Sequence, residues 1–171
     1  MNNLQFLIPE KDIYLRTGRI IIIISELSYS TKGNLILDIE KLSLFNFLVR
    51  YPVLLKKVKI INNDKDELEL LENEVGSIES KFPNNDSLFD YEDLYQILKI
   101  AAYYRFIEGK NYNQSFYYYI TEIGKDFSNN LNSEYFLRVK ELCKSLNRFR
   151  SMKTNKLKQM IEFSMEGNNH E

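Results

Sequence analysis

The residues that could do covalent chemistry in this chain are few, and their positions argue against an enzyme. The sequence contains one histidine, His170, next to the last residue, and one cysteine, Cys143. A Ser-His or Cys-His nucleophile needs both partners within hydrogen-bond reach on ordered elements. A structural zinc site needs Cys and His ligands that this inventory does not supply. We therefore predict no catalytic residue, no bound metal and no cofactor.

The acidic and glycine-containing stretches also lack the spacing of known ion or phosphate sites. An EF-hand alternates acids around a central glycine, and the stretch that begins Asp64-Lys-Asp-Glu-Leu has no such glycine. Gly18 and Gly109 are isolated glycines without the pattern of a phosphate loop. A solvated acidic surface is the expected role of these carboxylates.

Positive charge gathers near the C-terminus, where residues 138–158 hold eight Lys or Arg and a single acid. A helix beginning at Ser133 would place three of these cations in an outward row with a spacing of four residues. Such a row fits sequence-independent contact with DNA phosphates, the solvated side of an amphipathic helix, or docking on an acidic protein. These alternatives stay open. The candidate binding residues are Arg138, Lys140, Lys144, Arg148, Arg150 and Lys153.

An aromatic strand is predicted at Phe116–Ile120, with large side chains on both of its faces. A strand with one wet face would alternate apolar and polar residues. Either both faces are buried within the chain, which is the usual place of large rings, or a partner covers one of them. Tyrosine is common at interfaces because its ring buries area while its hydroxyl stays hydrated. The candidate partner contacts are Tyr112, Tyr117 and Tyr119.

The elements that carry these residues are predicted to be mostly helical. Tyr14–Leu27 includes five consecutive isoleucines, which favour a strand, but its length and the helical spacing of its apolar residues favour a buried helix. Asp38 is expected to cap a helix that runs to about Arg50 and that Pro52 ends. A short helix follows over 53–61, and further helices are expected to begin at Asp90, Thr121, Ser133 and Thr154.

The second half has the order of a winged helix. A helix ends near Phe106, a polar turn containing Gly109 follows, and the aromatic strand leads into a new helix at Thr121. The predicted fold is mainly α with a small β-wing, an N-terminal helical unit (1–61) being packed on a C-terminal winged-helix-like unit (87–166). An acidic connection (62–86) joins the two, and 167–171 is a tail.

Bulk composition limits the function further. The formal net charge of −1 excludes a generally basic nucleic-acid coat. A lone cysteine cannot form an internal disulfide, which favours a reducing compartment. The longest aliphatic run, Ile20–Ile24, is far shorter than the ~20 residues that span a bilayer. We expect a cytoplasmic protein without a membrane segment.

Two stretches together resemble a known family. The first combines Leu-Arg-Thr-Gly-Arg at 15–19 with Leu-Asp-Ile-Glu-Lys-Leu at 37–42 and Phe-Asn-Phe-Leu-Val-Arg-Tyr-Pro at 45–52. The second is the wing followed by Ile-Thr-Glu-Ile-Gly-Lys at 120–125. Over roughly 14–52 and 92–130 the chain is similar to the middle component of bacterial three-component systems built around an SMC-like ABC ATPase, a group that includes Lamassu antiphage defence.

The resemblance implies a small non-enzymatic subunit that bridges an SMC-like ATPase and an effector, often a nuclease, in defence against phage or plasmid DNA. The alternative is a stand-alone winged-helix transcriptional regulator. A recognition helix should expose Arg, Lys, Asn or Gln to the major groove, and Asp90–Phe106 offers only Gln96, Lys99 and Arg105. This composition disfavours sequence-specific binding.

Overall fold

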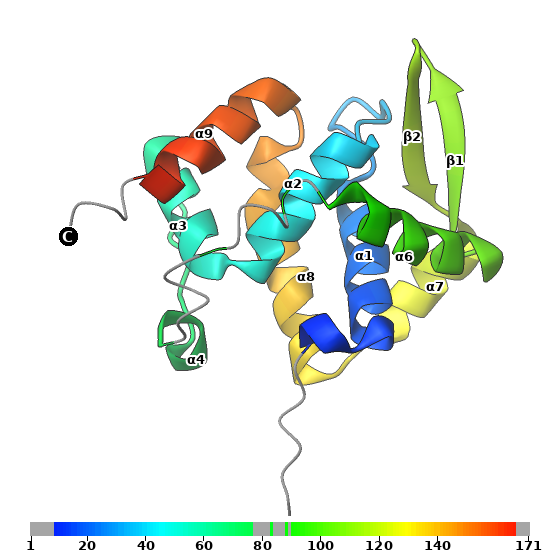
Figure 1. Ribbon diagram of the computed structural model, residues 1–171, viewed down its shortest axis with the longest axis horizontal. Helices are drawn as coiled ribbons and strands as arrows, with labels where there is room; N and C mark the ends of the chain where they lie inside the picture. The colour runs from blue at the N-terminus through cyan, green and yellow to red at the C-terminus, as the bar shows by residue number, and fades with distance from the viewer. Residues whose placement is uncertain (1–8, 77–82, 84–87, 89, 167–171) are drawn as a thin grey trace, which may run out of the picture.

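The computed structural model describes residues 9–76, 83, 88 and 90–166, which form eight α-helices and one two-stranded antiparallel hairpin (Figure 1). The predicted fold class, mainly α with a small β-wing, is therefore confirmed. The predicted tail with His170 lies outside the described residues, as does most of 77–89. The elements of the first half are η1 Pro9–Lys11, α1 Ile13–Leu27, α2 Ile39–Arg50, α3 Pro52–Ile61 and α4 Glu72–Val75. Those of the second half are α6 Tyr91–Tyr103, β1 Ile107–Tyr112, β2 Ser115–Ile120, α7 Glu122–Asn130, α8 Glu134–Leu146, η3 Asn147–Phe149 and α9 Thr154–Glu166.

Helix α1 forms the centre of the core, so the helical interpretation of 14–27 is confirmed. It begins where the Asp12 carboxylate accepts from the backbone N–H of Tyr14 at 2.8 Å. The five isoleucines at 20–24 are all fully buried, because α2, α6, α7 and α8 pack around this helix. A helix that is apolar on every side is stable only when it is surrounded in this way.

Helices α2 and α6 begin at the predicted residues. The predicted caps are present: Asp38 accepts from the N–H of Lys41 at 2.8 Å, and Asp90 accepts from the N–H of Asp93 at 3.1 Å. The segment between α1 and α2 is hydrogen-bonded to the hairpin, since Tyr118 N–H donates to the Leu37 carbonyl at 2.8 Å. Helices α3 and α4 lie between α2 and α6 in the chain. Buried side chains of both predicted units belong to one cluster.

The hairpin corrects the prediction that a polar turn occupies the residues before the aromatic strand. Those residues form β1, and the turn is limited to Asn113 and Gln114, whose φ angles are 47° and 66°. Two positive φ values are typical of the type I′ turn that closes two-residue hairpins. Strand β1 has no apolar alternation because every residue after Ile107 is exposed. Its Gly109 lies under the ring of Phe116, which a Cβ at that position would meet at 2.1 Å.

The C-terminal helices differ from the prediction in two details. Ser133 precedes α8, but its side chain makes no capping hydrogen bond. The helix ends at Leu146, and the backbone continues as the 3₁₀ turn η3, which buries Phe149 completely. The buried ammonium group of Lys41 supports the chain after η3 by donating to the carbonyls of Arg150 and Met152 at 2.6 and 2.7 Å.

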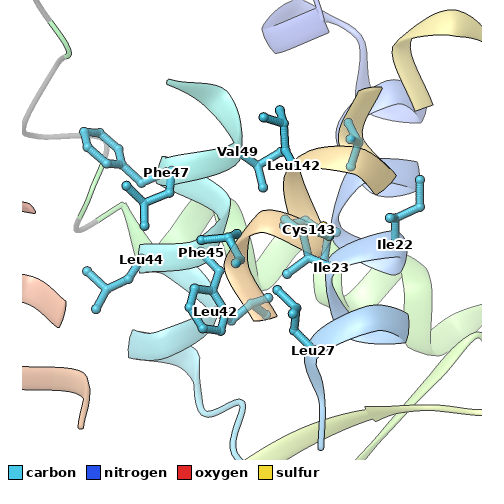
Figure 2. Packing of buried hydrophobic residues seen from close by; sticks show 14 of the residues in the cluster. Ile22, Ile23, Leu27, Leu42, Leu44, Phe45, Phe47, Val49, Leu142 and Cys143 are labelled. Atoms are coloured by element: carbon cyan, nitrogen blue, oxygen red, sulfur yellow. The ribbon is translucent and has the colours of Figure 1, made fainter. Parts of the chain in front are cut away.

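Cys143 lies inside the core, as its place on the apolar side of α8 predicts. Figure 2 shows Leu142 and Cys143 of α8 beside Ile23 of α1 and Val49 of α2. Burial raises the pKa of the Cys143 thiol well above its ordinary value. The thiol is therefore protonated at neutral pH and acts as a small apolar side chain.

Candidate partner-binding surfaces

The acidic segment, defined here as residues 64–74, lies along the predicted basic helix. Just after α8, Arg148 lies 2.9 Å from the carboxylate of Asp66. At the other end of α8, Nε and NH2 of Arg138 donate to the two carboxylate oxygens of Glu74 at 2.8 and 2.7 Å. The acidic segment runs antiparallel to α8, because Asp66 lies just after the C-terminal end of the helix and Glu74 lies beside Arg138 near its N-terminal end. The expectation of a solvated acidic surface is wrong for Glu74, whose side chain is 12% exposed, whereas Asp66, at 68%, is solvated as expected.

Asp64 connects the acidic segment to α3. The ammonium group of Lys59 donates to Asp64 Oδ2 at 2.7 Å, and Arg148 Nε lies 3.2 Å from Oδ1. Burial would raise the pKa of Asp64, but the hydrogen bond from Lys59, a backbone hydrogen bond and the charges of both cations lower it below its ordinary value. The carboxylate is therefore ionised at neutral pH, where it holds the beginning of the segment in place.

The other predicted cations divide into tethered and exposed ones. Lys140 donates to the carbonyl of Leu131 at 2.8 Å, just after α7, and Arg150 donates to a carbonyl of the α1–α2 connection at 3.1 Å. Lys144 and Lys153 are exposed, and neither has an ion-pair partner in the described chain. The predicted outward row consists of Lys140, Lys144 and Arg148. Of these, Lys140 is half-buried and Arg148 is paired with acids, so Lys144 alone is exposed without an ion pair in the described chain.

The three predicted interface tyrosines lie on one face of the hairpin. Glu108 pairs with Tyr119 and Lys110 pairs with Tyr117, and residues two apart share a face, so Tyr112 lies beside them. The Tyr119 hydroxyl donates to Glu108 at 2.6 Å, and this hydrogen bond raises the pKa of Tyr119. Tyr112 is 57% exposed, and the other two tyrosines are half-buried. The opposite face of β2 includes Tyr118 and Ile120, which pack partly on the core. Core packing therefore explains only one face of the aromatic strand.

A second aromatic surface, which the sequence interpretation missed, lies between α1, α6, α7 and α8. We call it the aromatic groove; its volume is about 830 Å³. Phe106 stacks on Phe127 at 4.2 Å between ring centroids and on Tyr104 at 5.8 Å. Tyr14 and Tyr103 are 83% and 81% exposed. The rings that line the groove are Tyr14, Tyr103, Tyr104, Phe106, Phe127 and Phe136.

Tyr104 shows why the groove was missed. Tyr104 follows Ile97 and Ala101 at helical spacing, which would place it on the buried side of a longer helix. However, α6 ends at Tyr103, and Arg105 turns the chain with a φ of 58°. Tyr104 is consequently 59% exposed. Thr17 lines the groove, and its buried Oγ1 has no hydrogen-bond partner among the described residues.

The Leu-Arg-Thr-Gly-Arg motif at 15–19 serves the fold. Arg19 is 3% exposed and donates to the Glu10 carboxylate, to Asn46 Oδ1 at 2.9 Å and to the Tyr135 hydroxyl at 3.0 Å. Burial would lower the pKa of Arg19, but the hydrogen bond to Glu10 raises it. Arg19 is therefore a buried cation that ties η1, α2 and α8 to α1.

The Thr-Glu-Ile-Gly-Lys motif also has a structural role, at the start of α7. Thr121 Oγ1 accepts from the N–H of Gly124 at 3.0 Å and donates to the carbonyl of Arg105 at 2.6 Å. A Cβ at Gly124 would lie 1.9 Å from the carbonyl oxygen of Phe106. Glycine is therefore required for α7 to approach the end of α6.

These features define a helical protein with two exposed aromatic surfaces and a basic helix whose arginines pair with the acidic segment. Over the described ranges, no helix is long and apolar enough to cross a bilayer, and no three Cys, His, Asp or Glu side chains gather as a metal site would require.

Comparison with protein families identifies the chain. Residues 27–159 match the family model of the ABC-three component (ABC-3C) system Middle Component 4, and the chain belongs to this family. It is thus a middle component of a bacterial defence-type complex whose other components are an ATPase and an effector. The matched span includes the acidic segment and α8, which lie beyond the resemblance visible in the sequence. No curated protein and no solved structure matches the chain significantly.

Proposed function

We propose that this protein is a non-catalytic accessory subunit that bridges an SMC-like ATPase and an effector in defence against phage or plasmid DNA. Family membership supports the presence of both partners, and the aromatic groove is the observation that carries the proposal. Two tyrosines more than four-fifths exposed at one groove would be costly on an isolated protein. Such rings are typical anchors of protein interfaces.

A bridge needs two separate contact surfaces, and the fold offers them. The aromatic groove lies where α1, α6, α7 and α8 meet, whereas the tyrosine face belongs to the hairpin that projects from the helices (Figure 1). We assign the groove to an apolar segment of the ATPase and the tyrosine face to the effector.

The alternative of a DNA-reading regulator has less support. Helix α6 precedes the hairpin, as a recognition helix would, but its exposed side chains include Glu92, Asp93, Tyr95 and Tyr103, with Lys99 as the cation. Acids there would repel phosphates, and few groups could bind base edges. The absence of catalysis is supported by the buried, protonated state of Cys143.

Truncating the groove tyrosines tests the assignment. In Tyr14→Ala/Tyr103→Ala, the affinity for the ATPase of the same system should fall by about tenfold or more, because each lost aromatic anchor costs about 1–2 kcal/mol. Both side chains are exposed, so the variant should keep its melting temperature. Co-expression followed by size-exclusion chromatography and titration calorimetry would measure the loss.

The matched control is Ile60→Ala/Phe163→Ala, which removes two apolar side chains that are 65% and 67% exposed on α3 and α9, away from the groove. It should bind both partners normally. Tyr112→Ala/Tyr117→Ala should release the effector and retain the ATPase. Retention of the ATPase by the groove variant at wild-type affinity would contradict the proposed interface.

A further inference from the structure

We propose that α8 and the turn after it carry a binding strip for duplex DNA phosphates, and that the acidic segment occupies this strip as an internal competitor. The inference rests on the proposed function in a complex that meets foreign DNA. It adds that, within the isolated subunit, the acidic segment blocks DNA from reaching the strip. The strip consists of Arg138, Lys144, Arg148 and Lys153.

The contacts to the acidic segment have the geometry of phosphate recognition. Arg138 holds Glu74 with two hydrogen bonds of 2.8 and 2.7 Å, one to each carboxylate oxygen. An arginine fork binds carboxylate and phosphate oxygens in the same bidentate way. Arg148 is likewise placed between two carboxylates, those of Asp64 and Asp66. The carboxylates therefore stand where phosphate oxygens would be bound.

Between the ion pairs that hold its ends at Asp64 and Glu74, the acidic segment has few apolar contacts that would oppose its displacement. Its helix α4 spans four residues, and Leu71 and Val75 are 46% and 50% exposed. Leu68 is 4% exposed, and Leu70 packs partly on the core. The Arg148–Asp66 pair is exposed on both sides, and such pairs add little stability. A segment with few buried contacts opens at a small fraction of the cost of global unfolding.

The strip has a useful length once it is uncovered. Arg138 lies on α8 and Arg148 in η3, ten residues later, which is roughly 16 Å along the helix and the turn after it. Duplex DNA presents one phosphate per about 3.4 Å of axis on each strand, so several phosphates fall within this length. Lys144 and Lys153 are already exposed and would extend the contact.

The experiment compares two charge-matched variants of the full chain. Asp66→Asn/Glu74→Gln removes two carboxylates that pair with the strip. Glu67→Gln/Glu72→Gln removes two exposed carboxylates of the same segment that form no ion pair with it in the described part of the chain. Both variants gain the same net charge and keep the Lys59–Asp64 pair. Binding to two unrelated 20-base-pair duplexes is followed by fluorescence anisotropy from about 50 to 200 mM salt.

In the strip-facing variant, DNA affinity should rise roughly tenfold at 100 mM salt, and the log–log salt slope should steepen by up to about 1.8 for two added phosphate contacts. The second variant should change affinity by less than about threefold and leave the slope unchanged. Adding Arg138→Gln/Arg148→Gln to the first variant should remove its gain, for both duplexes alike.

Equal gains in the two charge-matched variants would overturn the proposal, because they would show a general charge effect. Failure of every variant to bind duplex DNA at 50 mM salt would overturn it too. Neither failure touches the bridging proposal, since the partner titrations contain no DNA. Circular dichroism confirms that each variant is folded, and the isosteric amides preserve the shape of the segment.

Discussion

Glu10→Gln is expected to lower the free energy of unfolding by about 3–5 kcal/mol, because it leaves a buried cation without its carboxylate. Arg19 contacts both carboxylate oxygens of Glu10 through NH1 and NH2 and is 3% exposed. Arg50, whose Nε lies 2.9 Å from the same carboxylate, loses its partner as well. Urea denaturation followed by circular dichroism measures the loss.

A double variant separates charge burial from lost packing. Arg19→Met removes the buried charge and keeps much of the apolar volume, so Glu10→Gln/Arg19→Met should be more stable than Glu10→Gln alone. The two substitutions must then be non-additive, with the second partly compensating the first. Strictly additive losses would show that Arg19 contributes through packing and not through the ion pair.

The same pair predicts a pH dependence. Burial would raise the pKa of Glu10, but the hydrogen bond and charge of Arg19, with the charges of Arg50 and Arg16, lower it below the ordinary value of 4.5. Because the folded pKa is below the unfolded one, the stabilisation is complete above the unfolded pKa and is lost as the pH falls through the folded pKa. The wild type should therefore lose stability between about pH 5 and pH 3 more steeply than Glu10→Gln.

Gly124→Ala should destabilise the protein by about 3 kcal/mol or more, because the added Cβ overlaps a backbone carbonyl. The Cβ would lie 1.9 Å from Phe106 O and 2.8 Å from Ile120 Cδ1. A backbone oxygen cannot rotate away as a flexible side chain can, so α7 must move from the end of α6. The melting temperature should fall by roughly 6–12 °C for a chain of this size.

Gly76→Ala is the matched control. Gly76 has a right-handed helical backbone, and a Cβ there would meet its nearest neighbour, Glu72 O, at an ordinary 3.6 Å. The substitution should be neutral or raise stability by about 0.4–1 kcal/mol through the unfolded state. If Gly124→Ala melted at the same temperature as Gly76→Ala, the close approach of α7 to Phe106 would be disproved.

The helices were predictable because their signals are local. Asp38, Asp90 and Thr121 begin α2, α6 and α7 through hydrogen bonds to backbone groups within three residues. The same holds for the central helix, whose length and spacing outweighed the strand preference of its isoleucines. Strand β1 was not predictable in this way, because its polar side chains are exposed on both faces and leave no alternation.

The partner surfaces depend on segments that meet only in the folded chain. The sequence by itself determined that residues 138–158 are basic, that the hairpin is rich in tyrosine, and that the family is a three-component system. Tertiary structure alone decided that Glu74, 64 residues before Arg138, would neutralise that cation. It also decided that Tyr14 and Tyr103 would line one groove. Capping and periodicity act within one or two turns of a helix, whereas ion pairs and grooves depend on how distant helices pack.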